Sequence, residues 1–242
     1  MIWRIGCSGY HYPEWRGIFY PQKMTKALWF QYYCEHFKTI ELNVTFYKFP
    51  RVEFLETWYD RCPAGFTFSV KAPRVITHFK KFKDAQRYLS DFYTTVRLGL
   101  KDKLGCVLFQ FPATFVYDEE RLERIVRLTD LSFVNVFEFR HESWWNENVF
   151  RSFSERNIIF CGMDHPALPA DIVRTSAKVY HRMHGVPHLY FSKYSTERLE
   201  EIVQETIRQT DVNEVYIYFN NTADGAAIEN ARVFHGITEL VH

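Results

Sequence analysis

The sequence has no uninterrupted apolar run that approaches the roughly 20 residues a membrane helix needs, so it predicts no membrane association. Its first residues, MIWRIGCSGY, do not place a basic segment, an apolar core and a small-residue cleavage site in order, and we expect no secretory signal there. Neither sign of charge dominates, because 30 Lys and Arg oppose 29 Asp and Glu. The net charge of +1 excludes a strongly basic nucleic-acid scaffold, although it leaves room for a local basic patch.

Cysteine is scarce, and its number is odd. The absence of any CxxC spacing also speaks against a disulfide framework or a structural zinc site. We expect buried thiols that pack as small apolar side chains, in a reducing, cytoplasmic location. The five are Cys7, Cys34, Cys62, Cys106 and Cys161.

Low-complexity segments, Gly/Ser linkers and Pro-rich spacers are absent as well, so we expect one domain over residues 1–242. What recurs is a short apolar run followed by an amphipathic stretch. The runs are rich in Val, Ile, Phe and Tyr and have the length of strands. They are Ile2–Cys7, Thr39–Asn43, Phe66–Lys71, Gly105–Gln110, Val134–Phe139, Ile158–Cys161, Lys178–His184 and Glu214–Phe219.

The stretches between these runs have helical spacing of apolar residues, often after a capping residue. Only Pro166–Ala177 is doubtful, because its two prolines leave room for no more than a short or irregular helix. The predicted helices are Lys26–Phe37 after Thr25, Val52–Tyr59, Asp84–Leu98, one opened by Asp118, Asn146–Arg156, one opened by Ser195, and Gly225–Phe234.

Eight strands that alternate with helices require a parallel sheet with crossover connections. The number of units and the chain length predict an α/β fold, a single (β/α)8 TIM-type barrel with an irregular sixth helix. A doubly wound open sheet is the alternative, although no GxGxxG turn follows any of the strands.

In such a barrel the functional residues lie at the carboxyl ends of the strands. Side chains alternate there between the helix layer and the interior, and polar residues of one parity recur at these ends. The loop after the third strand adds Arg74. The predicted site residues are Ser8, Glu41, Asn43, Lys71, Arg74, Gln110, Glu138, Arg140, His184 and Asn220.

These residues indicate an enzyme that acts on an anionic, phosphorylated or sugar-like small molecule, because Lys71, Arg74 and Arg140, together with His184 if it is protonated, outweigh the two carboxylates. Glu41 and Glu138 are predicted to be an acid–base pair, as in a hydrolase or an isomerase. Lys71 has three open roles: base, Schiff-base former or electrostatic clamp. Ser8, Asn43, Gln110 and Asn220 would orient the ligand, and Arg74 would bind it or anchor its own loop.

Two alternatives concern the same charges. The buried charges of Arg4, Glu41, Lys71, Glu138 and Arg182 would also be explained by a closed structural ion network. A divalent metal on Glu41, Glu138, Asp164 and His184 has the right ligand types. Lys71 and Arg140 would compete with such an ion, and no HExxH motif is present, so we predict neither a metal nor another cofactor.

Other functions remain open at this point. The aromatic segment Ser8–Pro21 is either a lid or stacking platform or a loop pinned by its own rings. Together with the basic stretch Lys80–Lys83, it also permits a nucleic-acid binding or processing protein. A third possibility is a barrel that binds a ligand or a partner without turnover. The sequence does not determine the oligomeric state.

Short motifs follow one another along the whole chain. They are Ile5–Gly9 with Tyr12, Trp15, Gly17 and Phe19–Pro21; Glu41–Tyr47; Val70–Arg74 with Thr77–His78; Leu108–Pro112; Glu138–His141 with Ser143–Trp144; His184–Gly185; and Tyr218–Asn221 with Asn230–Ala231. With them the chain resembles the YecE-like family, catalogued as domain of unknown function seventy-two. The resemblance implies a TIM-type barrel and no established activity. The chain departs from the family pattern at Cys7 and Tyr10, where Thr and Trp are common, and it matches loosely around Asp164.

Overall fold

The computed structural model describes residues 1–241, and its nine strands all pair in parallel. All eight predicted strands are present within two residues of their expected ends, and one further short strand, β7, follows the sixth of them. The strands are β1 Ile2–Cys7, β2 Thr39–Leu42, β3 Thr67–Lys71, β4 Leu104–Phe111, β5 Asn135–Phe139, β6 Ile159–Phe160, β7 Gly162–Asp164, β8 Lys178–Met183 and β9 Glu214–Phe219.

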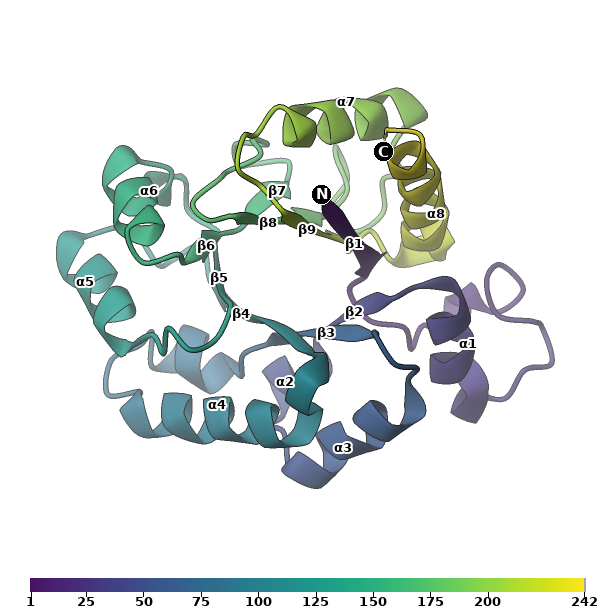
Figure 1. The fold of residues 1–242 in the computed structure, drawn as a ribbon, viewed down its shortest axis with the longest axis horizontal. Coiled ribbons are helices and arrows are strands. Elements are labelled where there is room, and N and C mark those ends of the chain that lie inside the picture. The colour runs from purple at the N-terminus through teal and green to yellow at the C-terminus, as the bar shows by residue number, and fades with distance from the viewer. Residues whose placement is uncertain (242) are drawn as a thin grey trace.

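Helices connect the strands and cover their outer side (Figure 1). Short 3-10 turns at Pro13–Trp15, Lys26–Leu28, Lys101–Lys103, Glu142–Trp144 and Ala223–Gly225, and a π-helical turn at Val75–Phe79, complete the connections. The α-helices are α1 Trp29–His36, α2 Val44–Tyr47, α3 Val52–Arg61, α4 Gln86–Leu100, α5 Glu119–Leu128, α6 Glu147–Ser154, α7 Thr196–Ile207 and α8 Ala226–Glu239. None of the helices in residues 1–241 is long and apolar enough to cross a membrane.

Three α-helices begin with a side-chain cap at the predicted residue, and two predicted helix starts have no such cap. The side chains of Asp118, Asn146 and Ser195 each accept a hydrogen bond from a backbone N–H in the first helical turn. Thr25 makes no such bond, and the chain after it begins as a 3-10 turn. Asp84 has a left-handed φ of 49°, so α4 begins only at Gln86. The segment after β7 forms no helix before β8, as its prolines predict.

The strands form two sheets, with the orders β1-β9-β8-β7 and β2-β3-β4-β5-β6. In Figure 1 they surround a common interior, with the helices outside. The prediction of a parallel α/β fold is therefore confirmed. The finer prediction of one closed barrel is not, because backbone pairing is interrupted at two places in the described chain: between β1 and β2, and between β6 and β7.

One interruption lies at the end of the predicted sixth strand, Ile158–Cys161. β6 pairs with β5, whereas β7 pairs with β8, and only Cys161 separates the two short strands. Cys161 N still donates to Phe137 O of β5 at 2.8 Å. Residues 159–164 thus form a covalent link between the two sheets.

The other interruption contains a side chain between two strands. Cys7 N of β1 donates to the Tyr33 hydroxyl at 2.8 Å, and this hydroxyl donates to Thr39 O of β2 at 3.1 Å. A Cβ at Gly6 would lie 2.4 Å from the same Thr39 oxygen, so only glycine permits this approach. A tyrosine hydroxyl therefore occupies the position of a direct backbone bond.

The buried apolar residues fall into two groups. The larger fills the space between strands and helices. The smaller one draws on β4, β5, β6, β8 and β9, and so joins both sheets around one interior. Its buried members are Cys106, Leu108, Val136, Ile159, Cys161, Tyr180, Tyr216 and Tyr218. All five cysteines are buried free thiols, as predicted.

Candidate functional site

The Glu41 carboxylate, at the end of β2, is surrounded by hydrogen-bond donors. It has no solvent exposure and accepts hydrogen bonds from Ser8 Oγ at 2.7 Å and Tyr180 Oη at 2.7 Å. Arg182 Nη2 donates to it at 2.6 Å, and Asn43 Nδ2 donates at 3.3 Å. A buried carboxylate needs such compensation, and four donors supply it.

Arg182 joins Glu41 to Glu138 across the interior. Its Nη1 lies 2.6 Å from Glu138 Oε2, and Arg140 Nε donates to the other Glu138 oxygen. Burial alone would raise the pKa of Glu138, but Arg140 and Arg182 outweigh it and hold this pKa well below its usual range. Glu138 is therefore ionised at neutral pH, with no proton to donate as an acid.

His184 is neutral, contrary to its predicted role as a cation. Burial, followed by the charges of Arg140 and Arg182, holds its pKa well below the usual value. Its Nε2 lies 2.9 Å from Arg140 Nη2, and because a guanidinium only donates, this nitrogen accepts. Its other ring nitrogen, Nδ1, lies 2.9 Å from Asn220 Nδ2. His184 thus positions Arg140 and adds no charge.

Lys71, at the end of β3, has no ionic partner in residues 1–241. No carboxylate oxygen lies within 4.0 Å of its Nζ, which sits 4.3 Å from the centre of the Phe46 ring. Burial, followed by the charge of Arg182, lowers its pKa to about 8. A half-buried amine with a pKa near neutrality at a strand end is typical of a functional residue.

The loop after Lys71 is tightly folded. The π-helical turn Val75–Phe79 follows it, and such turns are often found at functional sites. Burial, with the charges of Lys71 and neighbouring cations, lowers the pKa of His78 to about 4, so this ring is neutral beside the lysine. Arg74 is exposed and stacks over Phe79 at 5.3 Å, which places it at the rim.

Arg4 and Asp164 lie apart from this cluster, whereas Gln110 of β4 is the in-register neighbour of Glu138 on β5. Arg4 pairs with Glu214 at 2.9 Å, at the amino ends of β1 and β9, so it takes no part in the predicted ion network. Gln110 Nε2 donates to Phe111 O at 2.9 Å. Asp164 faces Arg198, with 3.5 Å between its Oδ2 and Nε.

The proposed metal ligands do not converge. Glu41 and Glu138 are bound by arginines, and Asp164 belongs to a separate ion pair. Residues 1–241 contain no group of three His, Cys, Asp or Glu side chains placed to hold a metal ion. The donor set around Arg182 therefore fits a cation poorly.

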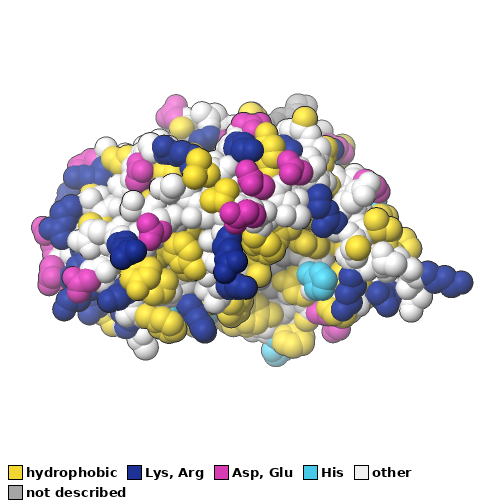
Figure 2. All heavy atoms as spheres, turned by 90° about the horizontal axis from the view of Figure 1, so that it is seen from below, with side chains coloured by type: hydrophobic (Ala, Val, Ile, Leu, Met, Phe, Trp, Pro, Cys, Tyr) yellow, Lys and Arg dark blue, Asp and Glu magenta, His cyan; other side chains and the backbone are white. Residues whose placement is uncertain are grey.

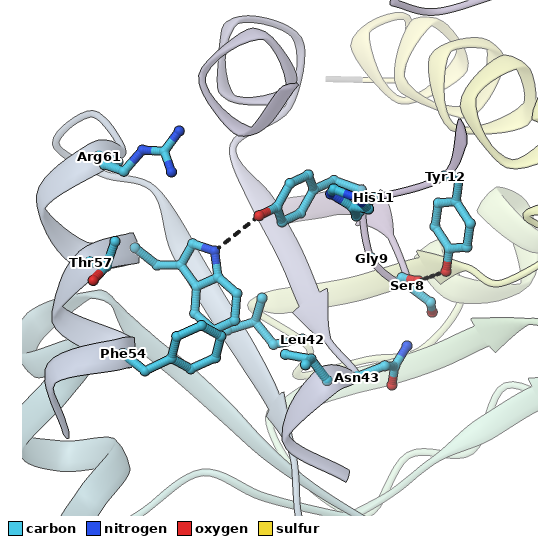
Figure 3. Close-up of a pocket in the computed structure, with 12 residues that line it drawn as sticks. Ser8, Gly9, His11, Tyr12, Leu42, Asn43, Phe54, Thr57 and Arg61 are labelled. Atoms are coloured by element: carbon cyan, nitrogen blue, oxygen red, sulfur yellow. Dashed lines mark hydrogen bonds between the residues drawn. The ribbon is translucent and has the colours of Figure 1, made fainter. Parts of the chain in front are cut away.

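A cavity of about 430 Å³ adjoins the cluster at Ser8 and Asn43 (Figure 3). Tyr10, His11 and Tyr12 form one wall, and Phe54, Thr57, Trp58 and Arg61 of α3 form the other. Its size is that of a small-molecule site.

The aromatic first loop is pinned by its own rings and also contributes a wall. Trp15 Nε1 donates to Thr222 O at 2.8 Å, and the Tyr20 ring stacks on Trp29 with centroids 4.6 Å apart. The earlier residues of this loop line the cavity. The interpretation as a loop pinned by its own rings is confirmed for Trp15 and Tyr20, and the role of the earlier residues as a lid or stacking platform stays a prediction.

Sequence reasoning missed two contributions to the site. Tyr180 lies two residues before Arg182 on β8, so their side chains point to the same side of the strand. This alternation could have placed Tyr180 in the interior from the sequence. The wall formed by α3 had no such signal, since its residues have the spacing of an ordinary amphipathic helix.

Comparison with known proteins gives one consistent family. The model of the family described as "Protein of unknown function DUF72" matches residues 4–241. The UPF0759 protein YunF of Bacillus subtilis is 25% identical over 250 residues, covering 88% of this chain and 87% of that protein.

Solved structures agree. A DUF72 family protein from Thermotoga maritima superposes with a TM-score of 0.89 at 27% identity, over 99% of this chain and 100% of the other. A DUF72 family protein from Enterococcus faecalis gives a TM-score of 0.84 at 19% identity, over 100% and 97% of the two chains, and shows the same fold.

Proposed function

The chain belongs to the DUF72 family, and from the geometry of its own site we propose that it is an enzyme that transfers a proton to or from an anionic small molecule. Lys71 is the catalytic residue. The observation that carries this proposal is a half-buried ammonium group at a strand end with no carboxylate partner in residues 1–241.

The proton transfer is simple to balance. The Lys71 ammonium ion gives a proton to the substrate and becomes a neutral amine, and it takes a proton back from the substrate at another position. A group whose pKa lies near the working pH is suited to this task, and the pKa of Lys71 is about 8. Glu41 and Glu138 support the reaction by fixing Arg182 and Arg140 rather than by exchanging protons.

The charge balance at the strand ends favours an anion. The two carboxylates neutralise the two guanidinium groups, and His184 is neutral, so a protonated Lys71 leaves an excess of one positive charge. Arg140 Nε donates to Glu138 and Arg140 Nη2 donates to His184, while Arg140 Nη1 makes no hydrogen bond within the described chain. We propose that this Nη1 and the Lys71 ammonium bind the substrate anion.

We also propose that the two sheets together form one functional barrel. Residues 159–164 and the Tyr33 hydroxyl bridge the two interruptions of backbone pairing, which supports a (β/α)8 arrangement. In that arrangement the cluster lies at the carboxyl ends of the strands, where barrels place their active sites. The five free thiols support a reducing, cytoplasmic location.

The test combines binding with an exchange assay. A thermal-shift panel of inorganic phosphate, sugar phosphates, carboxylates, divalent metals and short oligonucleotides identifies ligands, since a ligand at about 100 times its Kd stabilises by roughly 2.7 kcal/mol. Each ligand is then incubated with the protein in D₂O, and deuterium incorporation is followed by NMR. We expect anions to bind and at least one to exchange a proton. Exchange should fall at least about 100-fold in Lys71→Met and stay unchanged in the exposed-site control Lys23→Met.

Three results would overturn the proposal. Anion binding without exchange would indicate a binding protein. Equal exchange by Lys71→Met would remove the lysine from the chemistry. Binding of oligonucleotides alone, with affinity that falls steeply with salt, would indicate a nucleic-acid protein.

A further inference from the structure

The cavity beside the cluster has one wall made by a single helix face. Phe54, Thr57, Trp58 and Arg61 lie three, four and seven positions apart on α3, so they form one stripe along the helix. The Phe54 and Trp58 rings contact each other with centroids 4.4 Å apart. This wall presents flat apolar surface with one guanidinium at its far end, as Figure 3 shows.

The opposite wall is fixed in position. Tyr12 Oη donates to Ser8 O at 2.6 Å, and Trp58 Nε1 donates to Tyr10 Oη at 3.3 Å, which ties the two walls together. Both bonds are drawn in Figure 3. The cavity is therefore held open by contacts within the protein, which reduces the ordering cost of binding.

Asn43, at the edge of the cavity, has an unused acceptor. Its Nδ2 donates to Glu41, and the orientation of the amide is settled because a carboxylate only accepts. Its Oδ1 is buried and makes no hydrogen bond within residues 1–241. Buried polar atoms are normally satisfied, so this oxygen lacks a donor that a ligand can supply.

The cavity and the charged cluster share residues. Ser8 and Asn43 both line the cavity, and both donate to Glu41. β2, which ends just before Asn43, pairs with β3, which ends at Lys71. The Lys71 ammonium also lies over Phe46, three residues after Asn43. A ligand that reaches from the cavity over Asn43 thus meets the cationic groups of the proposed enzyme.

We propose that this cavity binds a flat aromatic or heteroaromatic ring of the substrate, which carries an N–H or O–H donor on its edge for Asn43 Oδ1. The anionic group of the same molecule lies at Lys71 and Arg140. This inference rests on the proposed function and adds the class of its substrate, an aryl or heteroaryl phosphate or carboxylate. A sugar fits less well, because most of the cavity wall is apolar.

The exposed surface around this side of the molecule is suited to small-ligand entry. Figure 2 views the molecule from the α3 and α4 side and shows hydrophobic side chains together with Lys and Arg across its lower half. Phe54 is 46% exposed, so it is accessible to a ligand and tolerant of substitution.

The experiment measures Kd by calorimetry for inorganic phosphate, phenyl phosphate, 4-aminophenyl phosphate and glucose 6-phosphate, with acetate, benzoate and 4-aminobenzoate as the carboxylate series. We expect phenyl phosphate to bind about 5- to 100-fold tighter than inorganic phosphate, the range for ring stacking. The amino group should add about 3- to 10-fold, as a hydrogen bond does.

Two variants locate the effect. Phe54→Ala should remove most of the advantage of the ring without weakening the binding of inorganic phosphate, whereas Phe79→Ala, an exposed aromatic outside the cavity, should change neither. Asn43→Leu should remove the advantage of the amino group and keep the advantage of the ring over inorganic phosphate.

The outcomes separate the two proposals. Anions that bind equally with and without a ring, or a preference for glucose 6-phosphate over phenyl phosphate, would overturn this inference and leave the proposed function in place. A ring advantage that Phe54→Ala does not reduce would also overturn it. Absence of binding by both series would overturn both proposals.

Discussion

Arg182 Nη2 lies 2.6 Å from Glu41 Oε1, and both side chains are closed to solvent. The same guanidinium binds Glu138 through Nη1, so one cation on β8 holds carboxylates from β2 and β5. Arg182 Nε has no partner within the described residues. Its ion pairs are therefore what compensates the burial of this charge.

Removing this cation should destabilise the fold strongly. Arg182→Met leaves two carboxylates without their shared partner, and we expect a loss of about 3–5 kcal/mol in the free energy of unfolding, measured by urea denaturation. Arg4→Met is the control, because its partner Glu214 still pairs with Lys178. This substitution should lower the free energy of unfolding by less than about 1 kcal/mol. Similar losses in both variants would contradict the role assigned to Arg182.

Gly6 should not tolerate even alanine. The added Cβ would lie 2.4 Å from Thr39 O and 3.0 Å from the Tyr33 hydroxyl, which forces β1 and β2 apart. We expect Gly6→Ala to cost about 1–3 kcal/mol of stability. Gly236→Ala, in α8 with open space around it, should instead stabilise by about 0.5–1 kcal/mol, and chemical denaturation of both variants checks the contrast.

Lys71 should reduce stability at neutral pH. Burial lowers its pKa from 10.5 to about 8, so between these values the unfolded chain binds a proton that the folded chain does not. Stability of the natural protein should therefore rise as the pH increases from about 8 to 10.5. Lys71→Met should be stabilising at pH 7 and lose this advantage by pH 10, as seen from urea midpoints. An advantage that is the same at both pH values would refute the lowered pKa.

His181 should make the fold sensitive to acid. Both of its ring nitrogens are buried without partners in residues 1–241, and burial, followed by the charge of Arg198, lowers its pKa from 6.5 to about 3. Stability from the neutral ring is present above pH 6.5 and is lost as the pH falls toward 3. Between pH 7 and pH 5, the natural protein should lose about 2 kcal/mol more than His181→Leu. The exposed-site variant His188→Leu should follow the natural protein, and parallel losses in all three would contradict the prediction.

The sequence by itself determined which residues form strands and which of them face the interior. Alternation with a period of two is a local property of a strand, so the parity of Glu41, Glu138 and Arg182 was readable without a fold. The family motifs indicated the same strand ends. The buried state of the cysteines followed from composition alone.

Only the tertiary structure decided which charge meets which. Arg4 and Arg182 have similar sequence settings, but one lies at the amino ends of the strands beside Glu214 and the other lies between two carboxylates. The neutral state of His184, the tyrosine bridge between β1 and β2, and the cavity wall on α3 also depend on elements far apart in the chain. Protonation and ion pairing are set by burial and by neighbours within a few ångströms, and these distances exist only once the strands have come together.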